Sequence, residues 1–439
     1  MTTEQALDLI IDARWVIPVE PDGLVLDDHS VVVNAGRIVA VQPSREAEAF
    51  RAARRISLPR HALIPGLVNV HTHAAMTLMR GLADDRPLMV WLKDHIWPVE
   101  LEHVSPEFVY DGTLLACVEM LRSGVTCAND MYFFPENAAQ AFIDAGMRAS
   151  IGLIAVEFPS AYASDADDYL AKGLALRDRI GNRDRLSFCM APHAPYTVGD
   201  RTLQRIATLA EELDLPVHIH LHETADEIKA SVEAHGVRPI ERLDGLGLVS
   251  ERLIAVHAVH LTPTEIALLA RRGCSVAHCP SSNLKLASGF APVAALLADG
   301  VNVGLGTDGA ASNNRLDLFQ EMRTAALLAK AVSGNAEAMP AQAALHSATL
   351  GGARALGLDT LIGSIVPGKA ADLCAVSLGD PEALPWYDPL SHLVYACGRE
   401  HVTHVWVAGE ALVVNRELRH LDWPEMEKRI GLWHTKLVV

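Results

Sequence analysis

Eight short apolar runs alternate with amphipathic stretches between residues 62 and 306, and this alternation constrains the fold more than any other feature. The apolar runs have the length of buried strands and are residues 62–70, 125–130, 149–156, 186–191, 216–221, 253–256, 274–277 and 301–306. Segments between them, such as RTLQRIATLAEELD, repeat apolar residues with helical period. Strands that alternate with helices indicate a parallel sheet covered by helices.

Two architectures contain such a sheet, a (β/α)₈ barrel and an open, doubly wound sheet. The glycine-rich G-x-G-x-x-G turn that opens the first helix of many doubly wound nucleotide-binding sheets does not occur in this sequence. Eight strands match the barrel, which absorbs about 250 residues or more. We therefore predict an α/β fold, a (β/α)₈ TIM-type barrel, over residues 61–368.

Further runs rich in valine and isoleucine occur near both ends of the chain. The N-terminal runs LDLIIDARWVIP and HSVVVNAGRIVAVQP include a hairpin signal at residues 34–36, and the C-terminal run HVTHVWVAGEALVVN turns at Gly409. We predict that residues 1–60 and 369–439 together form a small β-sandwich domain.

The composition excludes several classes of protein. With 37 basic and 54 acidic residues, the formal net charge of −17 has the wrong sign for a nucleic-acid binder or a polybasic membrane anchor. The seven cysteines are scattered, which favours buried thiols in a reducing compartment. The N-terminal segment has no basic leader, and no run approaches the roughly 18–20 apolar residues of a membrane span. We expect a cytoplasmic protein, and the composition is compatible with a homo-oligomer.

Polar residues occur where six of the eight predicted strands end. They are His71 and His73 after the first strand, His193 after the fourth, His220 and Glu223 at the fifth, His257 after the sixth, His278 after the seventh and Asp308 after the eighth. Active sites of such barrels lie at the carboxyl ends of the strands. The sequence therefore predicts the site at this end of the barrel.

His71 and His73 occupy positions i and i+2 of one strand and project to the same face. An H-x-H pair alone is more often a pair of surface histidines. A further strand-end histidine and an aspartate complete a mixed nitrogen and oxygen site suited to Zn²⁺ or Fe²⁺. Spacing does not select the third histidine, because His218, His220 and His222 share one face of their strand.

The sequence resembles the amidohydrolase superfamily, and within it the branch of 5-methylthioadenosine/S-adenosylhomocysteine deaminases. The motifs PGLVNVHTHAAMTLMRG, APHAPYT, HIHLHET, AVHAVHL, CPSSNLKLASG, GLGTDGAASNN and GSIVPGKAADL carry the resemblance in the family's order over residues 64–373. The resemblance implies that one divalent metal ion, Zn²⁺ with Fe²⁺ and Mn²⁺ as alternatives, is bound by His71, His73, His220 and Asp308. It selects His220 because the family pattern H-x-x-E matches His220 and Glu223.

The resemblance also implies catalytic roles for Glu223, His257 and Asp308. Asp308 would take a proton from water that the metal activates, His257 would orient that water, and Glu223 would donate a proton to the ring nitrogen as the water attacks. The leaving amine would then be protonated through these carboxylates. The simpler alternatives are a carboxylate in the first turn of a helix for Glu223 and a core histidine for His257. We expect His278 either to contact a metal ligand from outside or to be structural, and assign no role to His222 or His260.

The substrate implied by the resemblance is a nucleoside, a small molecule, bound by Trp91, Glu100 and His193 together with Glu223 and Asp308. An indole can pack on an apolar substituent, and a carboxylate can accept both ribose hydroxyls. The alternatives are a packing role for Trp91 and a solvated charge for Glu100.

One segment departs from relatives that accept S-adenosylhomocysteine, which hold its carboxylate with arginines after the third strand. Residues 151–171 contain no arginine or lysine but include Phe158 and Tyr162. We therefore expect 5′-methylthioadenosine to be preferred. The alternatives are a triazine, guanine or pterin deaminase or chlorohydrolase of the same superfamily, and a non-catalytic scaffold, which would normally have lost metal ligands.

Overall fold

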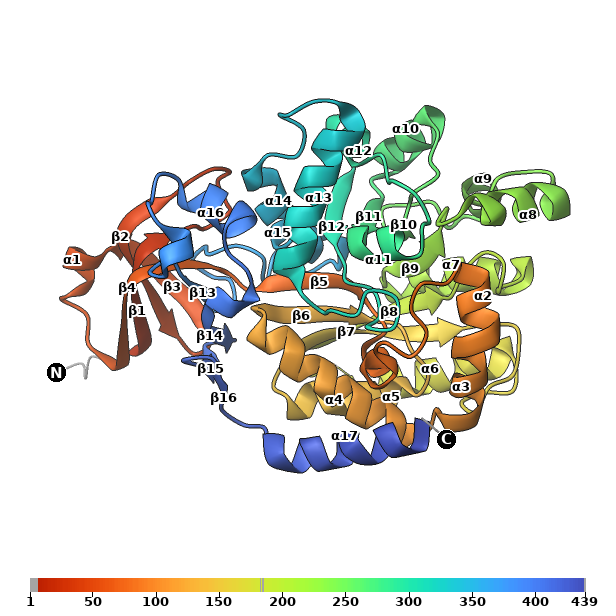
Figure 1. Ribbon diagram of the computed structural model, residues 1–439, viewed down its shortest axis with the longest axis horizontal. Coiled ribbons are helices and arrows are strands. Elements are labelled where there is room, and N and C mark those ends of the chain that lie inside the picture. The colour runs from red at the N-terminus through yellow and green to blue at the C-terminus, as the bar shows by residue number, and fades with distance from the viewer. Residues whose placement is uncertain (1–6, 182, 184, 438–439) are drawn as a thin grey trace.

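The computed structural model describes residues 7–181, 183 and 185–437, and the first six residues of the predicted N-terminal segment lie outside that part. The chain forms two eight-stranded sheets, one from its middle and one from both ends (Figure 1). The middle sheet runs in chain order, β5 (Leu67–Thr72), β6 (Val125–Asp130), β7 (Arg148–Ala155), β8 (Leu186–Pro192), β9 (Val217–Leu221), β10 (Leu253–His257), β11 (Ser275–His278) and β12 (Asn302–Leu305).

All paired neighbours in this middle sheet are parallel, and helices cover its outer face (Figure 1). Between β5 and β6 the chain forms four of these helices, which are α2 (Leu88–Val90), the π-helical η2 (Trp91–Ile96), α3 (Trp97–His103) and α4 (Pro106–Arg122). They are followed by α5 (Pro135–Asp144), α6 (Ala166–Ile180), α7 (Asp200–Leu213), α8 (Ala225–His235), α9 (Pro239–Gly245), α10 (Pro263–Arg272), α11 (Pro280–Lys285), α12 (Val293–Ala298), α13 (Leu318–Ser333), α14 (Ala341–Ser347) and α15 (Leu350–Ala355). This nearly closed (β/α)₈ barrel confirms the predicted fold class.

Side chains join the first and last strands of the barrel, where no ladder of paired residues runs. Asn69 donates from Nδ2 to Thr307 Oγ1 at 2.8 Å and accepts from the Thr307 amide at 3.0 Å. The Asp308 amide donates to the His71 carbonyl at 3.0 Å. The seam therefore brings Asp308 beside the histidines of the first strand.

The second sheet has the order β16-β15-β14-β13-β4-β1-β2-β3, so strands from both ends of the chain meet at β4 and β13. Its strands are β1 (Leu7–Val16), β2 (Leu26–Asn34), β3 (Arg37–Pro43), β4 (Ala52–Pro65), β13 (Leu373–Ser377), β14 (Val402–Val407), β15 (Glu410–Val414) and β16 (Glu417–Leu418). Both halves contribute to one apolar core that includes Ile11, Val33 and Trp406. The separate terminal sheet is as predicted, and the boundaries at residues 60 and 368 stay predictions.

The predicted first barrel strand, residues 62–70, divides between the two sheets. The chain leaves the terminal sheet at Pro65 and enters the barrel at Leu67, with Gly66 between them. A Cβ on Gly66 would lie 2.7 Å from the Cβ of Thr126, which is closer than side-chain atoms approach. The bend therefore depends on a residue with no side chain.

The remaining helices belong to the terminal segments. The short helix α1 (Ser44–Ala47) lies beside β2 and β3 of the terminal sheet, whereas α16 (Pro389–Tyr395) packs against α13 and α14 of the barrel and α17 (Trp423–Leu437) lies along α4 (Figure 1). The Trp433 ring meets Phe108 edge to face at 5.3 Å, and its Nε1 donates to Asp111 at 2.8 Å. The C-terminal segment is thus attached to both parts of the molecule.

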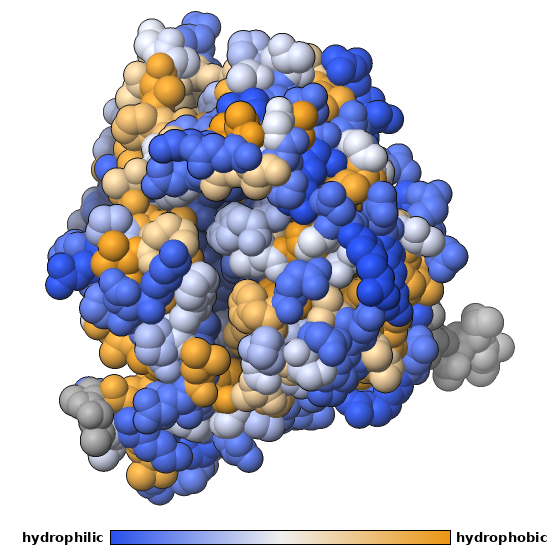
Figure 2. All heavy atoms as spheres, turned by 90° about the vertical axis from the view of Figure 1, so that its right-hand side faces the viewer, coloured by the Kyte–Doolittle hydropathy of each residue, from blue (hydrophilic) through white to orange (hydrophobic). Residues whose placement is uncertain are grey.

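The carboxyl ends of the barrel strands point to one side of the molecule, and that face is hollowed near its centre (Figure 2). Within the described part of the chain, no helix combines the length and apolar character needed to cross a membrane. All seven cysteines are buried and none forms a disulfide.

Candidate active site

Four side chains from three strand ends converge at the bottom of the hollow. Asp308 Oδ1 lies 3.3 Å from His71 Nε2 and 3.4 Å from His73 Nε2. His73 Nε2 lies 3.3 Å from His220 Nε2. The structure therefore brings together the predicted ligands His71, His73, His220 and Asp308.

The other ring nitrogens of these three histidines are held from behind. His73 Nδ1 donates to the Met131 carbonyl at 2.6 Å, and His220 Nδ1 donates to the His193 carbonyl at 2.6 Å. His71 Nδ1 lies 2.9 Å from Nε2 of the buried His218. Outer contacts of this kind orient the histidines of metal sites and direct their free nitrogens inward.

The donor set fits one divalent metal ion. Nitrogen and oxygen donors at about 2.0–2.1 Å from a tetrahedrally coordinated ion lie about 3.3–3.4 Å apart, which matches the separations measured here. Burial lowers the pKa of His71 to about 4 and holds the pKa of His220 well below its usual range. Both rings are therefore neutral at pH 7, which is the form that binds metals.

Asp308 is fixed through both carboxylate oxygens. Oδ1 faces the histidines and accepts from the Gly309 amide at 2.7 Å, and Oδ2 accepts from the Ser282 hydroxyl at 2.6 Å. Burial raises the pKa of Asp308, but the neighbouring histidines outweigh this and hold the pKa well below its usual range. The backbone of Asp308 has a left-handed φ of 61°, a conformation that aspartate adopts more readily than most residues.

Glu223 and His257 lie beside the four ligands. His257 Nε2 is 3.9 Å from Glu223 Oε2, and His257 Nδ1 donates to Asn283 Oδ1 at 2.8 Å. Glu223 precedes the helix α8 rather than occupying its first turn, and only 6% of the residue is exposed. Burial raises the pKa of Glu223, although the nearby His257 opposes the shift. This favours a protonated carboxyl group that can donate.

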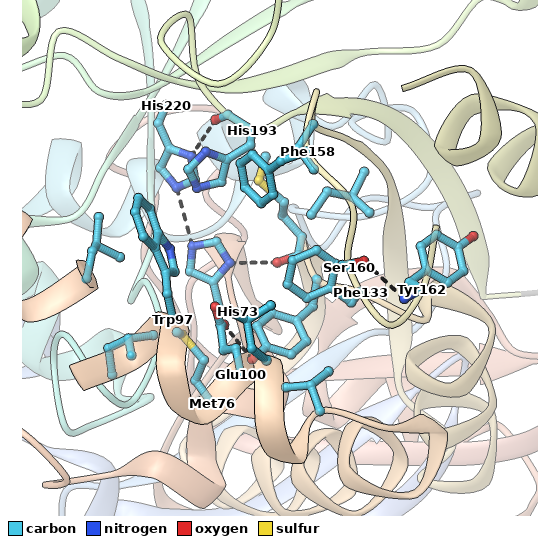
Figure 3. A pocket seen from close by; sticks show the side chains of 18 of the residues that line it. His73, Met76, Trp97, Glu100, Phe133, Phe158, Ser160, Tyr162, His193 and His220 are labelled. Atoms are coloured by element: carbon cyan, nitrogen blue, oxygen red, sulfur yellow. Dashed lines mark hydrogen bonds between the residues drawn. The ribbon is translucent and has the colours of Figure 1, made fainter. Parts of the chain in front are cut away.

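A cavity of about 340 Å³ connects these residues to an aromatic chamber. Trp97, Phe133 and Phe158 line the chamber, and the ring centroids of Trp97 and Phe158 lie 6.5 Å apart (Figure 3). Among the described residues that line the cavity there is no lysine or arginine. Lys172 lies behind this wall, where its Nζ donates to the Tyr162 carbonyl at 2.6 Å and to Asp168 at 2.9 Å.

The predicted nucleoside-binding residues also line the cavity. Glu100 accepts from the Tyr132 hydroxyl at 2.7 Å, and burial raises the pKa of Glu100 to about 7. Burial lowers the pKa of His193 to about 3, and its Nδ1 lies 3.0 Å from Thr197 Oγ1. Trp91 is 5% exposed, so it both lines the cavity and packs in the adjacent apolar cluster.

The remaining histidines of the strand ends do not join the site. The His222 ring accepts from the Ile240 amide at 3.1 Å and contacts the His260 carbonyl, away from the cavity. His278 is buried, and neither of its ring nitrogens has a hydrogen-bond partner among the described residues, so its role stays a prediction. Spacing did not decide whether His218 is a ligand. In the structure its Nε2 lies 2.9 Å from His71 Nδ1, so His218 contacts a ligand from outside the cluster.

Sequence reasoning did not single out Trp97, Tyr132, Ser282 or Asn283 as members of the site. Ser282 and Asn283 lie in the CPSSNLKLASG motif, so two polar residues shortly after the seventh strand were the available signal. Trp97 and Tyr132 carried no comparable signal, because aromatic residues in loops and helices are more often packing residues.

The fold and the site together define the class of protein. The amidohydrolase family model matches residues 62–412, and the chain belongs to this family.

Three relatives narrow the comparison. The 5-methylthioadenosine/S-adenosylhomocysteine deaminase of Teredinibacter turnerae is 48% identical over 438 residues, covering 100% of this chain and 99% of the relative. The 5′-deoxyadenosine deaminase of Methanothermobacter thermautotrophicus is 45% identical over 360 residues, covering 82% and 84%. A solved structure of an adenosine deaminase from Xanthomonas campestris with bound zinc is 52% identical, covers 99% of each chain and superposes with a TM-score of 0.98.

Proposed function

We propose that this protein removes the amino group of adenosine-type nucleosides by hydrolysis, releasing ammonia and the inosine analogue, and that it prefers 5′-methylthioadenosine. One observation carries the proposal, namely that a cluster of three histidines and an aspartate reaches, through His73, His220 and Asp308, the cavity that Glu223, His257 and Glu100 also line. The names of the three relatives support the same reaction.

One Zn²⁺ ion would be held by His71, His73, His220 and Asp308, and the zinc bound in the Xanthomonas campestris adenosine deaminase supports this choice of metal. Fe²⁺ and Mn²⁺ remain alternatives because mixed nitrogen and oxygen ligands also bind them. When bound, such an ion acts as a Lewis acid that makes water a nucleophile near neutral pH.

The residues around the ion divide the proton transfers. Asp308 is ionised at neutral pH and could accept a proton from the attacking water, and His257, whose Nε2 lies 3.9 Å from Glu223 Oε2, would orient that water. Glu223 can donate its proton to the ring nitrogen next to the carbon that bears the amino group. Asp308 would then pass its proton to the amino group, which leaves as ammonia, while Glu223 recovers a proton from the added hydroxyl. Each positioned acid or base contributes typically 10²–10⁴-fold to such a rate.

Residues next to the ligand cluster would select the nucleoside, since the His193 and His220 ring centroids lie 4.8 Å apart and Glu100 lies near His73 (Figure 3). Glu100, which already accepts a hydrogen bond from the Tyr132 hydroxyl, would also accept hydrogen bonds from the ribose hydroxyls. His193, which lines the same cavity, would also contact the nucleoside. Trp91 and Trp97 supply apolar walls. An uncharged methylthio group loses little on entering this chamber, whereas a carboxylate would be desolvated without a cation in the lining.

Ammonia release from a substrate panel tests the proposal. The panel contains 5′-methylthioadenosine, 5′-deoxyadenosine, adenosine, S-adenosylhomocysteine, guanine and a triazine. We expect the highest kcat/KM with 5′-methylthioadenosine and a lower value with S-adenosylhomocysteine. Faster turnover of guanine or the triazine than of every nucleoside would refute the proposed reaction, and a higher kcat/KM with S-adenosylhomocysteine would refute the preference.

A pair of histidine variants tests the ligand assignment in the same assay. His220→Ala should lower kcat by more than the roughly 10–100-fold typical of losing an outer partner of a metal ligand, and should release the bound metal. His235→Ala removes an exposed histidine at the end of α8 and should change neither activity nor metal content. Substantial activity and metal in His220→Ala would contradict the assignment.

A further inference from the structure

The short helix α11 carries two adjacent buried side chains that contact two different members of the site. Ser282 is 0% exposed and donates to Asp308, and Asn283 is 2% exposed and accepts from His257. Since neighbouring helical residues point in different directions, one helix can reach both partners. Neither Ser282 nor Asn283 is one of the four proposed ligands, and neither is among the residues that line the cavity.

The contact with Asn283 determines which way the His257 ring faces. An amide oxygen can only accept, so the 2.8 Å contact places a proton on His257 Nδ1. In the neutral ring the lone pair is then on Nε2, which points toward Glu223. Without the amide oxygen, rotation of the ring and the other tautomer would both become accessible.

The contact with Ser282 acts on Asp308 in a comparable way. The hydroxyl donates to Oδ2 at 2.6 Å, while the Gly309 amide and the two histidines surround Oδ1. Rotation of the carboxylate would break both sets of contacts. The serine therefore keeps one named oxygen directed at the histidine cluster.

A fully buried carboxylate on α13 holds α11 in place. Glu321 is 0% exposed, accepts from the Ser281 amide at 3.0 Å, and accepts from Asn313 Nδ2 at 2.9 Å. The same Asn313 Nδ2 donates to the carbonyl of Thr307, the residue before Asp308. Glu321 thus connects the start of α11 to the loop that carries Asp308. The hydrogen bonds that Glu321 accepts also offset part of the free-energy cost of burying its own carboxylate.

We propose that Ser282 and Asn283 are positioning residues that act through Asp308 and His257, with Glu321 keeping α11 in register. This inference rests on the proposed function, because it assigns His257 and Asp308 to the reaction. It predicts that Asn283 matters for kcat more than for KM, since Asn283 touches His257 and does not line the cavity.

A double-mutant cycle tests the inference with the best substrate of the panel. Asn283→Leu keeps the shape of the side chain but removes the acceptor, and should lower kcat about 10–100-fold with KM changed less than about threefold. In a His257→Gln background the same substitution should have almost no further effect, because residues that act as a unit are not additive. Asn129→Ala removes another buried asparagine, and its effect should be equal in both backgrounds.

Thermal unfolding and metal content of the same four proteins provide readouts that do not need activity. The double variant should melt no lower than the less stable single variant, and all four should retain the parent's metal content. A kcat for Asn283→Leu within threefold of the parent, or effects that add in both kcat and melting temperature, would overturn the inference. If the parent releases no ammonia from any nucleoside, the proposed function fails, and the melting cycle still decides whether Asn283 acts through His257.

Discussion

At the scale of single residues, Glu100 is a buried acid that shares its cavity with Glu223 and Asp308 and with several aromatic side chains. Burial raises its pKa from 4.5 to about 7, although the hydrogen bond from Tyr132 opposes the shift. Between these two pH values the unfolded chain has released a proton that the folded chain still holds. Stability from this group is therefore fully present below pH 4.5 and is lost as the pH rises through about 7.

The same pKa predicts a pH dependence of substrate binding. If the carboxylate accepts the ribose hydroxyls, KM for 5′-methylthioadenosine should rise as the pH falls below about 7, by up to about tenfold per pH unit. Glu100→Gln should show a high KM that does not vary with pH, and should melt at a higher temperature than the parent at pH 8. KM measured from pH 5.5 to 8.5 checks this.

The exposed neighbour Glu102 provides the control for Glu100. Its side chain is 76% exposed, so Glu102→Gln should leave the pH profile of KM unchanged. A parent enzyme whose KM is flat across this range would show that Glu100 does not bind the nucleoside in its ionised form.

Residues of the candidate site could be predicted from the sequence where they directly follow a predicted strand, and not where they lie in loops or short helices. His71, His73, His193 and His257 follow apolar runs directly, so their common end of the barrel could be read from the sequence. Choosing His220 over His218 needed the family resemblance, because both project to one face. The roles of Ser282 and Asn283 depend on which loops meet in space, and spacing along the chain does not contain that information.

At the scale of elements, each of the eight predicted barrel runs overlaps an observed strand. Strands buried on both faces read as continuous apolar runs, which makes them conspicuous in a sequence. The same property concealed the end of the first run, because residues 62–65 are buried in the terminal sheet and residues 67–70 in the barrel. Hydrophobicity does not change at Gly66, and only the missing side chain marks the change of sheet.

Gly66 should therefore tolerate no side chain. Gly66→Ala places a Cβ 2.7 Å from Thr126 Cβ and against its hydroxyl and methyl groups, and overpacking of this kind costs about 1–3 kcal/mol or more. Gly431→Ala, at an exposed position in α17 with open space around it, should instead stabilise the protein by about 0.5–1 kcal/mol. Denaturant unfolding measures both, and equal effects would contradict the packing argument.

At the scale of the whole molecule, the terminal sheet and the barrel share buried contacts that composition and periodicity did not predict. Asp372, at the start of the C-terminal strands, accepts from Arg148 of β7 at 2.9 and 3.2 Å and from the Ala408 amide at 2.8 Å. Both side chains of the ion pair are less than a tenth exposed. With α17 packed on α4, these contacts connect the two sheets at separate places.

This arrangement predicts that the two sheets unfold together. Asp372→Ala removes one side of a buried ion pair, which costs about 3–5 kcal/mol and corresponds to a melting temperature about 3–5 °C lower for a chain of this length. Asp359→Ala removes a carboxylate from an exposed pair with Arg354 and should shift stability by less than about 1 kcal/mol. Calorimetry should show one transition for the parent and for both variants. Two separated transitions in Asp372→Ala, one for each sheet, would mean that the sheets are independent and that the active-site barrel does not depend on the termini for its stability.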